Sequence, residues 1–320
     1  MLLVQNLLST NTADMSTLRP LLSCLQAARP FLRRTYSSSA QWKARQARDP
    51  YARDARVQGL KSRAAFKLLE MNEKYHLFKK GQTVVDLGYA PGSWSQVAFE
   101  LTRPSGRVVG IDIIPAQPPR GVASFQGDFL SPSVRRLVTN FLIQSHRQSL
   151  KDKASIPADD SSSEDSPDTV ITQPSYIDRE RHLDDESAVE AGSRVIPIVD
   201  IVLSDMSAPW EPTSGFSSYS LSNPYRRLMN TSGNNLRDHT GSMTLCNAAL
   251  DFANQMLRPG GHFICKYYQG SSDKLLETRL KKLFAKVHRD KPEASRSESK
   301  ESFFVALRRK DGVSLEPEAS

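Results

Sequence analysis

The stretch that most constrains the fold is residues 83–102, in which an apolar run, a glycine-containing turn and a helical segment follow one another directly. The run "TVVDL" has the β-branched composition of a buried strand, and "SWSQVAFEL" has the character of a helix. Between them, "DLGYAPG" places Gly88 and Gly92 in a tight turn. Strand, glycine turn and helix in this order predict an α/β fold with an anionic or nucleotide-like ligand at the turn.

The alternation of short apolar runs and helical stretches continues along the chain. Such alternation predicts a parallel sheet that is covered by helices on both faces. The predicted strands are 83–87, 107–113, 123–128, 199–205, 262–268 and 302–308, and the predicted helices are 62–75, 93–102, 131–143, 242–257 and 272–286.

Two segments interrupt this alternation. Residues 144–196 carry 12 acidic and 6 basic side chains and few aromatic residues. Because this composition cannot bury enough apolar surface to order itself, we interpret the segment as a disordered insertion in a crossover connection. Residues 207–241 form a polar loop after the fourth strand, at the edge where open α/β sheets bind ligands. We expect His239 to be a loop residue near the substrate.

Three kinds of ligand can be weighed at the glycine turn. A nucleoside triphosphate would need a Lys-Ser or Lys-Thr pair after the glycines, which this stretch lacks. A dinucleotide would need glycines where Ala90 and Ser93 stand. The remaining pattern, D-x-G-x-x-x-G, suits a ligand with one amino-acid-plus-nucleoside body, and S-adenosylmethionine fits it best. The alternative is a glycine turn with a purely structural role.

The ends of the next strands supply further cofactor contacts in this interpretation. Asp112 ends the second strand, where a carboxylate can accept both ribose hydroxyls. Asp128 ends the third strand and would face the adenine edge. The predicted cofactor residues are Asp86, Gly88, Pro91, Gly92, Trp94, Asp112, Asp128 and Asp205.

Bulk composition narrows the choice of partner. A net charge of +8 and a pI near 9.4 favour a polyanionic partner such as nucleic acid. The 3 cysteines have neither disulfide nor zinc spacing, which favours a reducing compartment, and we expect no metal. The chain has no apolar run of about 18 residues, so we expect no membrane span.

Residues 1–36 have the composition of a mitochondrial transit peptide. The first forty residues contain many Leu, Ser and Thr, four arginines and one acidic residue, Asp14. The stretch "RRTYSSS" resembles a matrix-protease site, with cleavage expected after Tyr36. We therefore predict a location in the mitochondrial matrix; a disordered N-terminal arm is the alternative.

Seven short motifs occur in order between residues 41 and 310. They are "SRAAFKLLE", "VVDLGYAPGSWSQVA", "IDIIP", "QGDF", "LSDMSAP", "LRPGGHFICKYYQG" and "KPEASRSESKESFFVALR". This series resembles the FtsJ/RrmJ family of ribose 2′-O-methyltransferases, and "RQARDPY" and "CKYYQGS" are most similar to its mitochondrial branch, which modifies a uridine of large-subunit rRNA. The resemblance implies one Rossmann-like methyltransferase domain over 41–310, with a basic extension over 41–80 and a disordered tail over 311–320. Its sheet would have seven mostly parallel strands, the last one antiparallel.

The resemblance also implies a catalytic tetrad, formed by Lys67, Asp205, Lys266 and Glu301. Lys266 interrupts "HFICKYY", which otherwise has the composition of a buried strand. If burial and a basic neighbour shift its ammonium towards neutrality, Lys266 can accept or steer the proton of the ribose hydroxyl. The two carboxylates would orient the lysines, and Lys67 would hold the ribose or a phosphate. The identity of the base stays open, because a coupled tetrad titrates as a unit.

RNA contacts are expected from the basic segment 41–67, in which cations are interleaved with Trp42 and Tyr51 as stacking residues. The alternative is a helix that packs on the domain with a charged outer face. The predicted phosphate contacts are Arg45, Arg48, Arg53, Arg56, Lys61 and Arg63.

Two departures from the family pattern lie beside the predicted site. Tyr89 stands where the family commonly has Ala, and it adds bulk next to the cofactor turn. Ser207 and Ala208 precede Pro209 where the family has "MAPN", which brings the shape of the catalytic loop into question. The rival functions are methylation of tRNA or of an mRNA-cap ribose, and rRNA binding by a ribosome-assembly factor with incidental activity. We expect a monomer.

Overall fold

The computed structural model describes residues 49–154, 197–209 and 231–316. The chain divides into two compact units, Met1–Asp49 and Pro50–Ser320, and the second unit contains every element below. The predicted transit peptide, Arg45, Arg48 and most of the predicted insertion lie outside the described residues.

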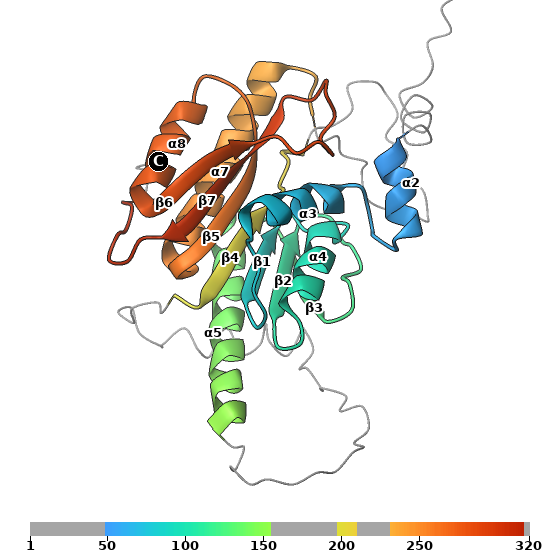
Figure 1. Ribbon diagram of the computed structural model, residues 1–320. Helices are drawn as coiled ribbons and strands as arrows, with labels where there is room; N and C mark the ends of the chain where they lie inside the picture. Colours follow the sequence, from blue (N-terminus) through green and yellow to red (C-terminus); the bar gives the residue numbers. More distant parts are fainter. Residues whose placement is uncertain (1–48, 155–196, 210–230, 317–320) are drawn as a thin grey trace, which may run out of the picture. The chain divides into compact units, whose positions relative to one another are not determined.

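Seven strands in the described part of the chain form one sheet with the order β3-β2-β1-β4-β5-β7-β6 (Figure 1). All neighbours in the first five strands pair in parallel, whereas β7 runs antiparallel to both β5 and β6. The predicted fold class, mostly parallel with an antiparallel last strand, is therefore confirmed. The strands are β1 Thr83–Leu87, β2 Arg107–Asp112, β3 Val122–Gln126, β4 Val199–Ser204, β5 Leu257–Tyr268, β6 Phe284–Asp290 and β7 Glu301–Arg309.

Helices cover both faces of this sheet (Figure 1). Apolar residues of α3 and α4 pack on one face, and those of α5, α7 and α8 pack on the other. The all-buried pattern of β4 follows from this sandwich, because both faces of a central parallel strand meet side chains. The helices are α2 Pro50–Val57, α3 Ala64–Tyr75, α4 Ser93–Thr102, α5 Pro132–Ala154, α7 Asn235–Met256 and α8 Asp273–Leu283.

Strand β6 corrects the prediction that a helix spans 272–286. Helix α8 ends at Leu283, and the chain then pairs with β7. Phe284 is buried and stacks on Phe263, with 6.1 Å between ring centroids. The rest of β6 is largely exposed, as is typical of a polar edge strand, so its sequence lacks the apolar alternation that would have predicted it.

Two helices are longer than predicted. Helix α5 continues to Ala154, so the first part of 144–196 is helical; Arg107 of β2 donates to the carbonyl oxygen of Ser145 at 2.6 Å and ties this extra part to the sheet. Helix α7 begins at Asn235, inside the predicted 207–241 loop, because the Asn234 side chain accepts from two backbone N–H groups of the first turn. Within the described ranges, no helix is both long and apolar enough to cross a membrane.

His239 is a buried residue of α7, so the prediction that it lies in a loop is wrong. Its Nδ1 lies 2.7 Å from the carbonyl oxygen of Tyr268, and its Nε2 accepts from the Ser272 backbone N–H at 3.1 Å. Gly270 passes so close that an added Cβ would lie 2.4 Å from the imidazole. His239 therefore fastens α7 to the chain after β5.

Candidate active site

The predicted site residues gather at the carboxyl edge of the sheet, because parallel strands end on the same side. Asp86 lies in β1, Asp112 ends β2, Asp205 follows β4 and Lys266 lies near the end of β5. The register pairs Leu87 with Ser204 and Ser204 with Cys265, so the ends of β1, β4 and β5 are level.

The glycine turn between β1 and α4 is shaped by its backbone. Gly88 has φ 80°, and a Cβ on it would lie 2.8 Å from the Cα of Met206. Gly92 has φ 103°, and a Cβ there would lie 2.9 Å from Pro119 Cδ. Both positions require glycine, since a side chain would be strained and would meet its neighbours. The turn leads into the first N–H groups of α4, a favourable place for a ligand carboxylate.

Asp86 lies fully buried beneath this turn. Its Oδ2 accepts from the Ser95 hydroxyl at 2.6 Å, whereas its Oδ1 has no hydrogen-bond partner among the described residues. Burial raises the pKa of Asp86 to about 7, against the opposing hydrogen bond from Ser95. A buried carboxylate with an unused oxygen is compatible with a cationic ligand nearby, because the ligand would stabilise its charge.

Asp112 is held in place by the two loops that flank its strand end. Its Oδ2 accepts from the backbone N–H of Ala90 at 3.0 Å, and its Oδ1 accepts from that of Ile114 at 2.9 Å. Burial raises the pKa of Asp112, although these backbone hydrogen bonds lower it. Each oxygen keeps a second lone pair, so the side chain can still accept ribose hydroxyls.

Three other predicted cofactor residues are placed differently from the strand-end acids. Asp128 lies two residues beyond the end of β3, is exposed, and accepts from the Leu130 backbone N–H at 2.9 Å. Pro91 is exposed in the turn. The Trp94 ring is buried in the core, where its Nε1 donates to the Ala64 carbonyl oxygen at 2.9 Å. The indole N–H of Trp94 is therefore already committed to the protein.

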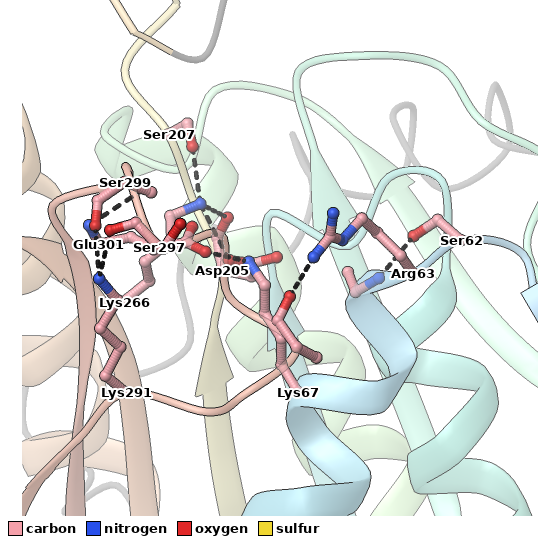
Figure 2. Close-up of polar contacts among 12 residues, drawn as sticks. Ser62, Arg63, Lys67, Asp205, Ser207, Lys266, Lys291, Ser297, Ser299 and Glu301 are labelled. Atoms are coloured by element: carbon pink, nitrogen blue, oxygen red, sulfur yellow. Dashed lines mark hydrogen bonds and ion pairs between the residues drawn. The ribbon is translucent and has the colours of Figure 1, made fainter. Parts of the chain in front are cut away.

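Lys266 and Asp205 form the first of two ion pairs in the site (Figure 2). The Lys266 Nζ lies 2.9 Å from Asp205 Oδ1 and 2.7 Å from the Asp205 carbonyl oxygen. It also donates to the Ser207 hydroxyl at 2.7 Å. The Asp205 backbone N–H donates to Leu87 O at 3.1 Å, which anchors the pair to β1.

Lys67 and Glu301 form the second ion pair, which joins α3 to the first residue of β7 (Figure 2). Their Nζ and Oε1 atoms are 2.7 Å apart, and the two side chains are only 11% and 12% exposed. Lys67 also lies over the Phe303 ring, 5.6 Å from its centroid. The buried position of Lys67 separates it from the exposed lysines that amphipathic helices usually carry.

Neighbouring charges within the two ion pairs shift the pKa values of Lys266 and Glu301. Burial by itself lowers the pKa of Lys266, but Asp205, Tyr268 and Glu301 raise it, and the result is a pKa above the usual value. Burial raises the pKa of Glu301, but Lys67 outweighs it and leaves that pKa lowered. The pKa of Lys266 is thus shifted away from neutrality in this structure, because Asp205, Tyr268 and Glu301 outweigh the effect of its burial.

A short loop over 291–300 positions Glu301. Lys291 donates to the carbonyl oxygens of Ser297 and Ser299, at 3.3 and 2.8 Å, and the Ser299 hydroxyl accepts from the Glu301 backbone N–H at 3.2 Å. Arg63 reaches this loop from the chain before α3 and donates to the Ala294 carbonyl oxygen. Sequence reasoning missed these contacts, because each joins a side chain to a backbone group, and backbone groups carry no sequence signal.

The predicted phosphate-binding residues fall into two groups within the described chain. Arg53 and Arg56 are exposed on α2. Lys61 instead donates to the Gln117 carbonyl oxygen at 2.5 Å, and Arg63 both holds Ala294 and lies 5.5 Å from the Tyr51 ring centroid. Tyr51 also pairs with the Phe66 ring, so it is engaged within the fold.

The sheet order, the glycine turn and the charged edge define the class of the protein as a Rossmann-like methyltransferase. The family model described as "FtsJ-like methyltransferase" matches residues 60–309, which is most of the chain. The chain therefore belongs to this family. It is 38% identical to the Saccharomyces cerevisiae protein named "rRNA methyltransferase 2, mitochondrial", over 87% of this chain and 90% of the relative. The Schizosaccharomyces pombe protein of the same name is 34% identical, over 84% of this chain and 95% of the relative. The Rickettsia bellii protein named "Ribosomal RNA large subunit methyltransferase E" is 34% identical, over 87% of this chain and 92% of the relative.

Proposed function

We propose that this protein transfers a methyl group from S-adenosylmethionine to a ribose 2′-hydroxyl, on a uridine of mitochondrial large-subunit rRNA. The names of the relatives support rRNA as the substrate and the mitochondrion as the location. The matrix follows from the transit-peptide composition of residues 1–36. We further propose that the protein acts as a monomer.

The observation that carries the proposal is the pair of lysine–carboxylate contacts, Lys266–Asp205 and Lys67–Glu301. Two partly buried ion pairs at a ligand-binding edge are costly to maintain for stability alone. Glu301 contributes to the charge environment of Lys266, so the two pairs are coupled. They match the four positions that the family resemblance assigned to catalysis.

The cofactor would lie against the glycine turn. Gly88 and Gly92 would admit its amino-acid part, the N–H groups of α4 would hold its carboxylate, and Asp112 would accept its ribose hydroxyls. Asp86 would stabilise its positive charge from below the turn. When bound, S-adenosylmethionine supplies an electrophilic methyl group on a sulfonium centre.

The tetrad would act on the acceptor ribose. With acidic groups facing its ammonium, Lys266 would donate a hydrogen bond to the 2′-oxygen and stabilise the negative charge that develops there, while the hydroxyl proton passes to a carboxylate of the tetrad or to water. Asp205 would hold Lys266 in place through their ion pair. The ion pair between Lys67 and Glu301 would form the opposite wall of the acceptor site. Removing one such donor typically costs about 10²–10³-fold in rate.

The acceptor RNA would approach over α2. Arg53 and Arg56 are exposed there, and the link after α2 is fixed to the first turn of α4, since Gln96 bonds both the Gly59 carbonyl oxygen and the Lys61 backbone N–H. We expect these two exposed cations to lie on the path by which RNA reaches the ligand edge.

The test is mass-spectrometric mapping of ribose methylation in mitochondrial rRNA from cells that carry either the wild-type protein or Lys266→Met. Loss of one 2′-O-methyl uridine from the large subunit is expected, with protein abundance unchanged. Lys79→Met, at an exposed position, is the matched control and should leave the modification intact. Unchanged methylation in the Lys266→Met cells would refute the proposal. Normal ribosome assembly without the modification would separate catalysis from an assembly role.

A further inference from the structure

The Lys266 ammonium is surrounded by as many oxygens as it has N–H donors. An ammonium carries three donors. Lys266 donates to the Asp205 carbonyl oxygen and to the Ser207 hydroxyl, each at 2.7 Å, and Asp205 Oδ1 lies 2.9 Å from the same nitrogen. Asp205 Oδ1 makes an ion-pair contact with Lys266 but accepts no hydrogen bond, so Lys266 makes two hydrogen bonds, and an acceptor hydroxyl that enters this crowded site competes with these oxygens for the ammonium.

The three oxygens differ in how easily they can be replaced. The Asp205 carbonyl is part of a backbone segment anchored to β1 through the Asp205 N–H. The Asp205 carboxylate carries the charge that balances Lys266, and separating them would leave a buried charge unpaired. Ser207 is neutral, lies two residues further along the loop that leaves β4, and is half-buried. Exchange of one hydroxyl for another at this position conserves charge and hydrogen bonds.

Tyr268 provides a second link to the same hydroxyl. Its side chain hydrogen-bonds Ser207, and its phenol belongs to the groups that face the Lys266 ammonium, together with Asp205 and Glu301. Ser207 therefore joins the loop after β4 to the end of β5 at the tetrad. It also lies at one of the two places where the sequence departs from the family pattern.

We propose that Ser207 is a positioning residue for Lys266, whose hydroxyl keeps the ammonium aimed at the place that the acceptor ribose hydroxyl takes when RNA binds. This proposal rests on the proposed function. Before RNA binds, Ser207 fills that place and prevents Lys266 from turning away. On binding, the ribose 2′-oxygen replaces the Ser207 oxygen and finds the donor already oriented, so less ordering remains for the reaction step.

The test compares Ser207→Ala, Ser207→Thr and the wild type. Ser207→Ala should lower kcat about tenfold while the KM for an rRNA fragment stays the same or falls, because no serine has to be displaced. Ser207→Ala also removes a hydrogen bond that stabilises the protonated form of Lys266. The pKa of Lys266 should therefore fall, and the alkaline limb of the pH–rate profile should move to lower pH. Ser207→Thr retains the hydroxyl and should restore both properties.

A second measurement is independent of the RNA substrate. NMR titration of the Lys266 side chain in the RNA-free protein should give a lower pKa in Ser207→Ala than in the wild type or in Ser207→Thr. An altered Lys266 titration in a protein that methylates no RNA would support the contact and refute the proposed function. Unchanged titration and kcat in Ser207→Ala would overturn the positioning role, as would an equal loss of activity and unfolding stability in both variants.

Discussion

The proposed cofactor half and the proposed acceptor half of the site are built in opposite ways. The cofactor half comes from one continuous stretch, from Asp86 in β1 to Asp112 at the end of β2, and its shape depends on two glycines with positive φ. The acceptor half joins side chains that are far apart in the sequence: Lys67 and Glu301 are 234 positions apart, and Asp205 and Lys266 are 61 positions apart. Local backbone shape thus forms one half, and long-range charge pairing forms the other.

This difference determines how substitutions should affect each half of the site. An added methyl group at the glycine turn would strain the backbone without changing any charge. Removal of one charge from the acceptor half would leave its buried partner uncompensated. Substitutions that separate these two mechanisms are therefore the best tests of the comparison.

Gly88→Ala should have the largest effect. Its φ of 80° disfavours a side chain by about 1–2 kcal/mol, and overpacking against Met206 adds about 1–3 kcal/mol. We expect a loss of about 4 kcal/mol in the free energy of unfolding and more than about tenfold weaker cofactor binding by calorimetry. The matched control is Gly260→Ala, which has the same φ of 80° but no atom within 4 Å of the new Cβ. Equal losses in the two variants would rule out the steric explanation.

Lys67→Met should come next, because it leaves Glu301 charged and only 12% exposed. Breaking a pair of this kind costs about 3 kcal/mol, measurable by guanidinium denaturation. The double variant Lys67→Met/Glu301→Gln should lose less than the sum of the single variants. Glu100→Gln is the control, since the Arg103–Glu100 pair is 58% and 60% exposed and should contribute less than about 1 kcal/mol. Additive losses in the double variant would show that the Lys67–Glu301 pair is not coupled.

Asp86→Asn should change the pH dependence of stability. The folded-state pKa of about 7 lies above the usual aspartate value of 3.8, so the folded protein binds this proton more tightly than the unfolded chain does. Stability therefore falls as pH rises between these two values, and an uncharged Asn removes this fall. The gain from Asp86→Asn should be about 2 kcal/mol larger at pH 8 than at pH 5. Ser95→Ala should extend the fall in stability to higher pH, because the Ser95 hydrogen bond lowers this pKa; a gain independent of pH would contradict the assignment.

The sequence was sufficient for features that depend on neighbouring residues. Strand β1 matches its predicted range, and β2 ends one residue early, because apolar runs beside a glycine turn have few other structures available. Strand β6 could not be predicted, since its exposed residues become a strand only by pairing with β7.

The protonation of Lys266 could not be read from the sequence either. It depends on Asp205, Tyr268 and Glu301, which only the fold brings to face the ammonium. The motif identified the residues of the acceptor half as a hypothesis, but the contacts of Ser207 and Arg63 needed three dimensions. The sequence could not predict these contacts because the acceptor half joins residues from elements that are far apart in the chain.

The smallest expected effect concerns the outer cations of the acceptor half. Arg53 and Arg56 are exposed, whereas Lys67 and Lys266 are committed to carboxylates, so charge removal on α2 should weaken RNA binding without altering the free energy of unfolding. In Arg53→Ala/Arg56→Ala, the slope of log affinity against log salt should fall by about 0.7 for each phosphate that the variant no longer neutralises. Arg103→Ala is the control: it removes an exposed cation at the far end of α4, at the opposite edge of the sheet from the site. A filter-binding series over salt concentration distinguishes the two variants. An equal change of slope per removed charge in both would mean that net charge, and not a surface centred on α2, governs RNA binding.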